Sequence, residues 1–507
     1  MKVKVRPKPG TSTIGLSLKS FRGFRESGDF RLAPLTCLVG ANSSGKSSII
    51  SAILLLKQSL EQERLSTRVT PLMLSGPYCD LGNFRDVVHA HKVKSEIGFA
   101  FKVPVGLIRV PLDPREPIVK MDVPRSVTRG PAYFANPYAH FMVSSKHELP
   151  STRAVTVELS FVVDAPFGPS LSKLLLDVEG VGSARFLRTT RGERRQHWRA
   201  YIHDLPSQSV AMRFFRTRFF PRIEPRQEIL NRCPGRTKQR IRRFLHASGM
   251  VLEYLQRVLI LSEVIGPFRT PPERRYAFGG FTTTRSGPSG EQASDLLITE
   301  KLLKTPKHPL QSAVSFWLQH FKLADKISVE DLAKNVNLFE LALAGAGRTP
   351  RANVADVGYG ISQILPVIVQ GLLMRPGGIY MVQQPELHLH PDAQAGLADF
   401  FLYLTSCGIR VIVETHSEYL LIRLRRRLAE GKLDVGRSLP GLRRRSVPLS
   451  KEDVTVLLTK IERQRLGAKV SELALGNAFQ FENLPKDFMS QALDDRLALL
   501  RAVGTKG

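Results

Sequence analysis

The sequence lacks the features of a membrane-spanning, secreted or disulfide-stabilised protein. No uninterrupted apolar run in its 507 residues approaches the roughly 18 residues that a bilayer requires. The basic N-terminus is not followed by an apolar segment and a small-residue cleavage site, so a secretory signal is not expected. The cysteines Cys37, Cys79, Cys233 and Cys407 form no Cys-x-x-Cys pair, which argues against a zinc ribbon or a disulfide framework. We expect a cytoplasmic protein with reduced cysteines.

Acidic residues are scarce relative to basic ones. The chain has 45 Asp and Glu against 74 Lys and Arg, a formal net charge of +29, yet its 42% hydrophobic content excludes a disordered polycation. Residues 185–275 alone carry 21 basic and 7 acidic residues, a net charge of +14. Within them, Arg213–Arg222 interleaves cations with aromatic residues. This region indicates nucleic acid or an acidic protein as a partner, and the alternative is a solvated basic face over buried phenylalanines.

A glycine-bearing loop lies between a predicted strand and a predicted helix. Leu35–Val39 is typical of a buried strand, and apolar residues recur with a helical period from Lys46 to about Glu63. The loop between them fits the pattern G-x-x-x-x-G-K-[ST]. In such a loop backbone N–H groups surround phosphate oxygens, the lysine reaches the β- and γ-phosphates, and the serine hydroxyl binds Mg²⁺. The expected nucleotide-binding residues here are Gly40, Ala41, Asn42, Ser43, Ser44, Gly45, Lys46, Ser47 and Ser48.

Four segments resemble, in order, the motifs of ABC-type ATPases related to the SMC, RecF and OLD proteins. Residues 36–48 resemble the P-loop, 356–366 the signature segment, 379–391 the Walker B segment and 413–418 the switch-histidine segment. Together with residues 481–488, they resemble prokaryotic AAA ATPases with a small C-terminal module of unknown function, which recur in bacterial anti-phage systems. The resemblance implies an α/β P-loop NTPase fold of ABC-ATPase type, with a mixed sheet, flanking helices and an inserted β-rich and basic helical middle region.

The resemblance also implies that ATP lies between two paired heads. Ser362 and Gln363 would contact the γ-phosphate held by the second head, and His416 would sense it within the same chain. Such pairing would make the chain a nucleotide-driven switch that controls an effector protein in anti-phage defence. The implied cofactors are ATP and Mg²⁺, and the implied partners are a second copy of the chain and the effector. The alternative is a RecF-like DNA-binding ATPase that acts in repair or recombination.

The Walker B segment departs from the family pattern. Gln383 and Gln384 stand where such families place an acid that holds Mg²⁺ and, commonly, a catalytic glutamate. An amide supplies neither the negative charge nor the basic oxygen of a carboxylate. We therefore expect ATP binding with weak or blocked hydrolysis, Gln383 being either a natural loss or a substitution that traps ATP. The expected catalytic positions are Gln383, Gln384, Glu386 and His416, the metal positions are Ser47 and Gln383, and the carboxylates that could compensate include Glu386 and Glu414.

The pattern of expected elements divides the chain into five parts. Short β-rich runs at 96–103 and 154–163 predict an antiparallel region, helical patterns return from about 294 to 334, and helices alternate with strands from 360 to 430, which predicts a parallel sheet. The expected parts are the N-terminal lobe of the ATPase head (1–65), a β-rich flank (66–180), a basic, largely helical insert (181–345), the C-terminal lobe of the head (346–430) and a small C-terminal module (431–507).

Overall fold

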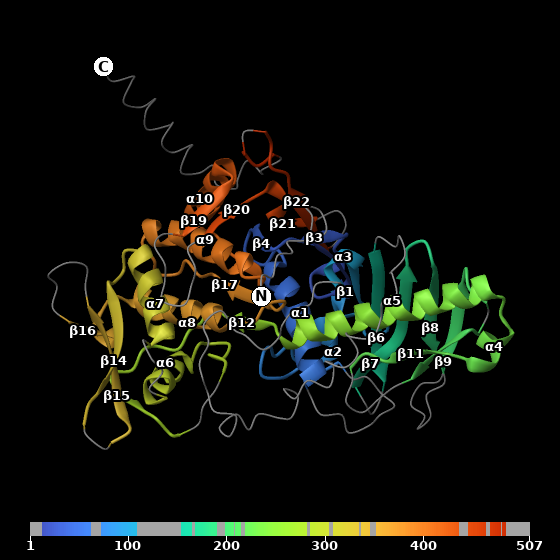
Figure 1. The fold of residues 1–507 in the computed structure, drawn as a ribbon, viewed down its shortest axis with the longest axis horizontal. Helices are drawn as coiled ribbons and strands as arrows, with labels where there is room; N and C mark the ends of the chain where they lie inside the picture. The colour runs from blue at the N-terminus through green and yellow to red at the C-terminus, as the bar shows by residue number, and fades with distance from the viewer. Residues whose placement is uncertain are drawn as a thin grey trace.

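Two large β-sheets lie side by side in the computed structural model (Figure 1). The structure describes residues 13–61, 72–108, 154–164, 168–189, 198–206, 208–213, 219–280, 284–303, 308–333, 336–344, 351–435, 445–462, 467–477 and 479–482. The two sheets meet at their edges, where the backbone N–H of Ala468 donates to the carbonyl of Gly23 and that of Val470 donates to the carbonyl of Ser27. None of the helices in these ranges is long and apolar enough to cross a membrane.

The central sheet has six strands in the order β12-β17-β18-β4-β21-β22. The first five run parallel, and β22 pairs antiparallel with β21, so the sheet is mixed as expected. The residues of β4 are all buried, which is usual for a parallel strand covered on both faces. The strands are β12 (Glu263–Ile265), β17 (Ile379–Gln383), β18 (Arg410–Glu414), β4 (Leu35–Gly40), β21 (Val454–Glu462) and β22 (Gly467–Leu473).

Helices cover both faces of the central sheet. Alternate residues of each strand face opposite sides, so that Leu38 packs in the same core as α1 and Cys37 in the core that contains α8 and α9. The Ser417 side chain accepts a hydrogen bond from the Leu420 N–H and caps the start of α10, which ends at Gly431 in the left-handed region. The helices are α1 (Lys46–Glu61) on one face and α6 (Ala293–Leu302), α7 (Pro309–His320), α8 (Tyr359–Leu373), α9 (Pro391–Ser406) and α10 (Glu418–Glu430) on the other.

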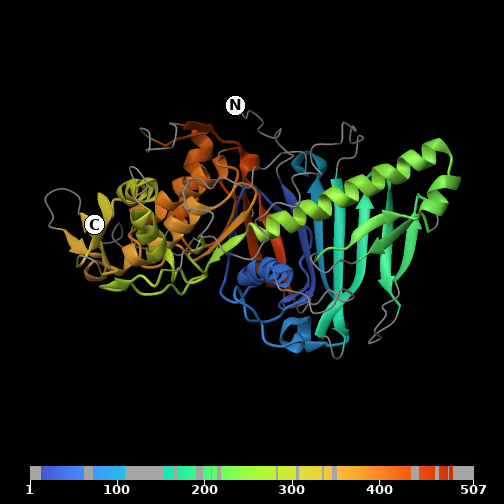
Figure 2. The same ribbon diagram turned by 60° about the horizontal axis from the view of Figure 1, so that its bottom comes forward.

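The second large sheet is antiparallel, as expected for the β-rich region. Its strands are β1 (Ile14–Phe21), β2 (Phe24–Glu26), β3 (Phe30–Leu32), β5 (Ile97–Pro104), β6 (Ala154–Asp164), β7 (Gly168–Val178), β8 (Gly182–Arg188) and β9 (Trp198–His203). Figure 2 shows α5 (Gly235–Ile260) running across these strands. Its buried side chains, among them Ile241, Phe244 and Val251, belong to the core of this sheet. Arg236, Arg242 and Arg243 in its first half are exposed to solvent.

Smaller elements complete the described part of the chain. Two strand pairs stand alone, β10 (Val210–Arg213) with β11 (Arg222–Pro225) and β19 (Lys432–Val435) with β20 (Arg445–Pro448). A small sheet contains β13 (Tyr276–Ala277), β14 (Lys326–Asp331), β15 (Leu338–Ala344) and β16 (Ala352–Asn353). The short helices are α2 (Phe84–Val87), α3 (Val105–Ile108) and α4 (Gln227–Arg232).

The structure differs from the expectation of a largely helical 181–345 region. Strands β8 to β11 lie within its first 45 residues, and β14 lies inside the stretch expected to be helical up to residue 334. These strands are short, and charged residues on their exposed faces hide the alternation that would have predicted them. Strand pairing also crosses the expected boundaries, because β12 from this region and β21 and β22 from the C-terminal residues belong to the central sheet.

Candidate active site

The loop that joins β4 to α1 lies at the carboxyl edge of the parallel strands, where ligands bind in open α/β sheets. Two of its glycines adopt positive φ, +140° at Gly40 and +106° at Gly45. A Cβ atom at Gly40 would lie 2.4 Å from the carbonyl oxygen of Thr459, and one at Gly45 would lie 2.8 Å from the ring of Phe24. Both positions therefore require glycine for their backbone conformation and for the close approach of their neighbours.

Lys46 is buried at the base of this loop. Its Nζ donates hydrogen bonds to the carbonyls of Gly40 at 3.0 Å and Ala41 at 2.8 Å. Burial lowers the pKa of Lys46, and the charges of Glu414 and Glu386 oppose that shift. Both carboxylates, which the resemblance had indicated as compensating acids, lie more than 300 residues away in the sequence. The ammonium group is thus held beside the loop backbone, where a phosphate would need a positive charge.

The hydroxyl of Ser47 contacts the carboxylate of Glu414 at the end of β18. The Ser47 Oγ lies 2.8 Å from Glu414 Oε1 and 2.9 Å from Oε2, and the Nε2 of Gln383 donates to Oε2 at 2.9 Å. The parallel register sets Gln383 beside Glu414, because these residues are paired in β17 and β18. The two expected metal positions, Ser47 and Gln383, therefore meet through a third residue, Glu414.

The switch-histidine segment is anchored by Glu386. Its buried carboxylate accepts hydrogen bonds from the Thr415 hydroxyl at 2.9 Å and from the backbone N–H of His416 at 2.7 Å. Partial burial lowers the pKa of the exposed His416 side chain, and the positive charge of Lys46 lowers it further. Glu386 thus holds the segment that carries His416, and this role uses both of its carboxylate oxygens.

Arg269 lies behind the Walker B segment, in a position for which the sequence predicted no role. Its side chain is only 6% exposed, and its Nη2 donates to the backbone carbonyls of Gln383 at 2.7 Å and Gln384 at 3.3 Å. Burial lowers the pKa of Arg269 to about 10. Gln384 adopts a positive φ of +45°. Arg269 therefore fixes the backbone at which β17 ends.

Thr459 of β21 also contributes to the loop. Its Oγ1 lies 2.5 Å from the Oγ of Ser44, and it donates to the carbonyl of Val39 at 3.3 Å. Strand β21 runs parallel to β4, so it places this hydroxyl beside the loop. The residues expected to form a separate C-terminal module thus support the candidate nucleotide site.

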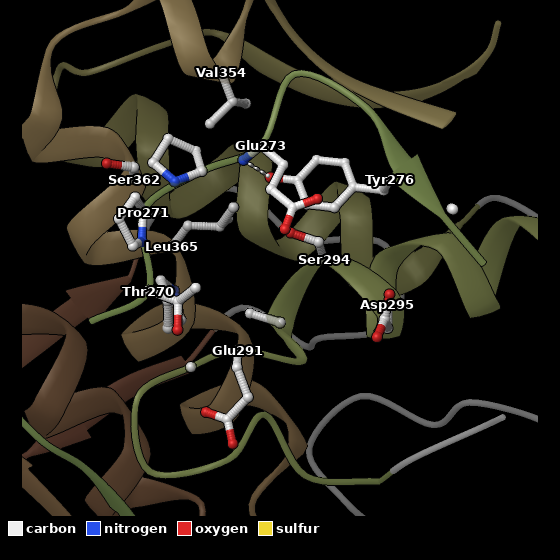
Figure 3. A pocket seen from close by; sticks show the side chains of 15 residues that line it. Thr270, Pro271, Glu273, Tyr276, Glu291, Ser294, Asp295, Val354, Ser362 and Leu365 are labelled. Carbon is white, nitrogen blue, oxygen red and sulfur yellow. Dashed lines mark hydrogen bonds between the residues drawn. The ribbon is translucent and has the colours of Figure 1, made fainter. Parts of the chain in front are cut away.

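Ser362 and Gln363 lie on α8. Ser362 lines a cavity of about 210 Å³, and the P-loop residues are not among the residues that line it (Figure 3). The hydroxyl of Ser362 donates to the carbonyl of Tyr359 at 2.8 Å. Glu273, Glu291 and Asp295 also line this cavity, and burial together with the charge of Glu273 raises the pKa of Asp295. Among the residues that the structure describes, no Lys or Arg lines it. The structure therefore brings the P-loop, Walker B and switch segments together and leaves the signature segment at this other surface.

The residues at the sheet edge fit a nucleoside triphosphate and a divalent cation. The positive-φ glycines expose loop backbone, and Lys46 supplies a buried positive charge for phosphate. The Ser47 hydroxyl and the Glu414 carboxylate are hard oxygen ligands of the type that Mg²⁺ prefers. Within the described residues, no group of three or more His, Cys, Asp and Glu side chains is arranged to hold a metal ion without a nucleotide.

Comparisons with known proteins give a family and several similar structures. Residues 300–423 match the family described as "AAA domain, putative AbiEii toxin, Type IV TA system". An Smc head bound to the C-terminal winged-helix domain of ScpA is 11% identical, with a TM-score of 0.39 and coverage of 91% of this chain and 98% of that one. The Smc head from Pyrococcus furiosus with an extended coiled coil, bound to the C-terminal domain of ScpA, is 10% identical, with a TM-score of 0.40 and coverage of 97% and 99%.

A third structure, the SMC head domain from Thermotoga maritima, is 9% identical, with a TM-score of 0.34 and coverage of 91% of this chain and 99% of that one. No curated protein matches the sequence. The mixed sheet, the loop between β4 and α1 and the matched AAA domain agree with the fold expected from the sequence. The chain has a P-loop NTPase fold of the ABC-ATPase type, and its residues 300–423 are similar to an AAA domain.

Proposed function

We propose that this chain is a nucleotide-driven dimerisation switch, the sensor or regulator ATPase of a bacterial anti-phage defence system that controls a partner effector. One observation carries the proposal: Lys46, Ser47, Gln383 and His416, which come from three distant segments, converge at one edge of the central sheet. Convergence of this kind can report the presence of a γ-phosphate to more than one segment at once.

The chain's own residues divide the work in this proposal. Backbone N–H groups of the loop and the ammonium of Lys46 bind the phosphates, and Ser47 orients the cation. Bound ATP supplies the γ-phosphate that distinguishes the two states. His416 contacts that phosphate from within the chain, and Ser362 and Gln363 of the second copy complete the site. Gln383 and Gln384 provide no general base, so hydrolysis is slow or blocked and the paired state persists.

Nucleotide content and molar mass together test the proposal. The purified chain and its Lys46→Ala variant are compared by chromatography of the bound nucleotide and by light scattering with ATP or ADP in Mg²⁺. We expect retained ATP and a doubled mass with ATP for the parent chain, and neither for Lys46→Ala, because the variant lacks the buried charge beside the loop. Equal nucleotide content in both proteins would contradict the assignment of the nucleotide site to this loop.

Two further variants separate pairing from binding and hydrolysis. Ser362→Arg should abolish the ATP-dependent increase in mass while ATP binding persists, and Ser95→Arg, in a turn of the antiparallel sheet, is its matched control. Gln383→Glu should restore phosphate release if only the absent carboxylate limits turnover. An ATP-dependent dimer that survives Ser362→Arg would show that the heads pair by another surface.

The alternative function is a RecF-like DNA-binding ATPase in repair or recombination. The observation that favours it is a basic ridge, which we define as the exposed residues Arg232, Arg236, Arg242 and Arg243 of α4 and α5. The ion pairs recorded for the described part of the chain include none of these arginines. An effector that binds only the ATP form supports the first function, whereas salt-sensitive DNA binding that requires ATP supports the second.

A further inference from the structure

The carboxylate that faces the P-loop serine belongs to β18, the strand beside the Walker B strand. Both oxygens of Glu414 lie within 2.9 Å of the Ser47 hydroxyl, at 2.8 and 2.9 Å. The Gln383 amide, at the end of β17, directs its Nε2 toward Glu414 at 2.9 Å. An amide N–H is a donor and cannot bind a cation, so in this arrangement Gln383 orients the carboxylate of its neighbour.

Glu414 is buried, and among the described residues it forms no ion pair within 4.0 Å. It is 5% exposed, and its carboxylate accepts side-chain hydrogen bonds from the neutral Ser47 and Gln383. The lysine of the loop, Lys46, interacts with this carboxylate electrostatically but donates its hydrogen bonds to the loop carbonyls. A carboxylate removed from water with no cation in direct contact is costly, so a cation bound beside Glu414 would stabilise it.

The chemistry of the contact indicates which cation would fill it. In P-loop enzymes the serine or threonine after the lysine binds the Mg²⁺ that accompanies the nucleotide. A hydroxyl and a carboxylate on one side of the cation are hard oxygen ligands, and Mg²⁺ takes the remaining oxygens from phosphate and water. Glu414 thus places beside Ser47 the negative charge that Gln383 lacks.

We propose that Glu414 supplies the negative charge that holds Mg²⁺ beside bound ATP, in place of the acid that is absent at position 383. Gln383 is then a positioning residue that acts through Glu414. The inference rests on the proposed ATP site, and it concerns the metal dependence of nucleotide binding, a property that is measurable without turnover. It also gives a reason why an amide is compatible with position 383: a second carboxylate there would lie against the first.

The test measures the dissociation constant of a fluorescent ATP analogue in EDTA and in Mg²⁺, for the full chain. We expect Mg²⁺ to tighten binding to the parent chain and Glu414→Gln to reduce that enhancement by at least about tenfold, with little change in EDTA. Glu179→Gln, an exposed site in the turn after β7, is the matched control and should keep the full enhancement. Circular dichroism establishes that each variant is folded.

A charge exchange distinguishes a metal anchor from a structural contact. The double variant Glu414→Gln with Gln383→Glu moves the carboxylate from β18 to β17 and keeps one acid and one amide in contact. We expect it to regain most of the Mg²⁺ enhancement that Glu414→Gln loses, because the charge again lies beside Ser47. A structural role would give no such recovery.

The outcomes separate this inference from the proposed function. If the parent chain binds no ATP analogue in either condition, the proposed function fails. If the parent binds with an Mg²⁺ enhancement that Glu414→Gln retains in full, the ATP site stands and the assignment of Glu414 is overturned. Loss of the enhancement in Glu414→Gln without recovery in the double variant also contradicts the anchoring role.

Discussion

At the scale of single residues, burial lowers the reactivity of two cysteines, Cys37 and Cys79. Burial raises the pKa of the Cys37 thiol to about 12, and it raises that of Cys79 to about 12 as well. Because the thiolate is the reactive form, we expect iodoacetamide at pH 8 to leave both unmodified in the folded chain and to modify both in urea. Peptide mass spectrometry measures each site. Modification of Cys37 at the same rate in folded and unfolded protein would contradict the burial of β4.

The site was predictable from the sequence where its residues belong to a local motif. Gly40, Lys46 and Ser47 belong to one local motif, and their loop lies between a strand and a helix as predicted. Thr459 and Arg269 could not be assigned, because their contacts with the loop and with the end of β17 depend on which strands become neighbours. No spacing in a single sequence encodes that order.

At the scale of elements, one carboxylate joins three helices. Asp399 of α9 is 1% exposed and accepts hydrogen bonds from His320 of α7 and from Arg423 and Arg427 of α10. Burial alone would raise the pKa of Asp399, but the hydrogen bonds from His320 and Arg427 and the charge of Arg427 lower it well below its usual range. Arg423 and Arg427, which follow the switch histidine, therefore help to hold the helices of the head together.

We predict that Asp399→Asn lowers the free energy of unfolding at pH 7 by about 3–5 kcal/mol, since it leaves two guanidinium groups short of a buried charge. A carboxyl whose pKa is lowered by folding stabilises the protein above its unfolded value, about 3.9, and loses that effect as pH falls. Urea unfolding should therefore show a difference between parent and variant that shrinks below about pH 4.

The control for this prediction is Asp392→Asn. Asp392 is also on α9 and pairs with Lys322, but both side chains are largely exposed, so the pair contributes little. A difference for Asp399→Asn that is no larger than the control, or that grows as the pH falls, would contradict the assigned cluster.

Elements with strong periodicity were predicted within a few residues. The strand and helix around the loop, β17, β18 and helices α8 to α10 all lie where the sequence placed them. The short strands β8 to β11 were missed, because arginines and polar residues on exposed faces blur a period of two in segments of four to seven residues. Of the aromatic residues in 213–222, Phe219 and Phe220 are buried, and residues 214–218 lie outside the described part.

At the scale of the whole molecule, positive charge gathers at the end of the antiparallel sheet. In the first half of α5 the apolar face packs on the sheet, and the basic ridge of Arg232, Arg236, Arg242 and Arg243 faces solvent. No large hydrophobic side chain between residues 210 and 260 is exposed among the described residues. Protein interfaces depend on apolar anchors, so a ridge without them favours phosphate contacts over an acidic protein.

We predict that the chain binds duplex DNA with an affinity that falls strongly as the salt concentration rises. Changing all four ridge arginines to Gln should reduce the magnitude of the slope of log K against log salt by about 3–4. Fluorescence anisotropy over a range of salt concentrations measures the slope. The control changes four exposed lysines elsewhere, Lys92, Lys94, Lys102 and Lys326, to Gln. An equal effect of both sets would indicate attraction by net charge alone, and a partner protein that binds only the unsubstituted ridge would favour the acidic-protein alternative.

The pairing of β4 determines how late in synthesis the nucleotide site can form. Its two neighbours in the sheet are β18 and β21, which follow it along the chain by about 370 and 420 residues. During synthesis on the ribosome, β4 has both edges unpaired until nearly the whole polypeptide has emerged. A nascent chain released before residue 454 therefore lacks the strand that braces Ser44, and it exposes an apolar edge to chaperones and proteases rather than a nucleotide site.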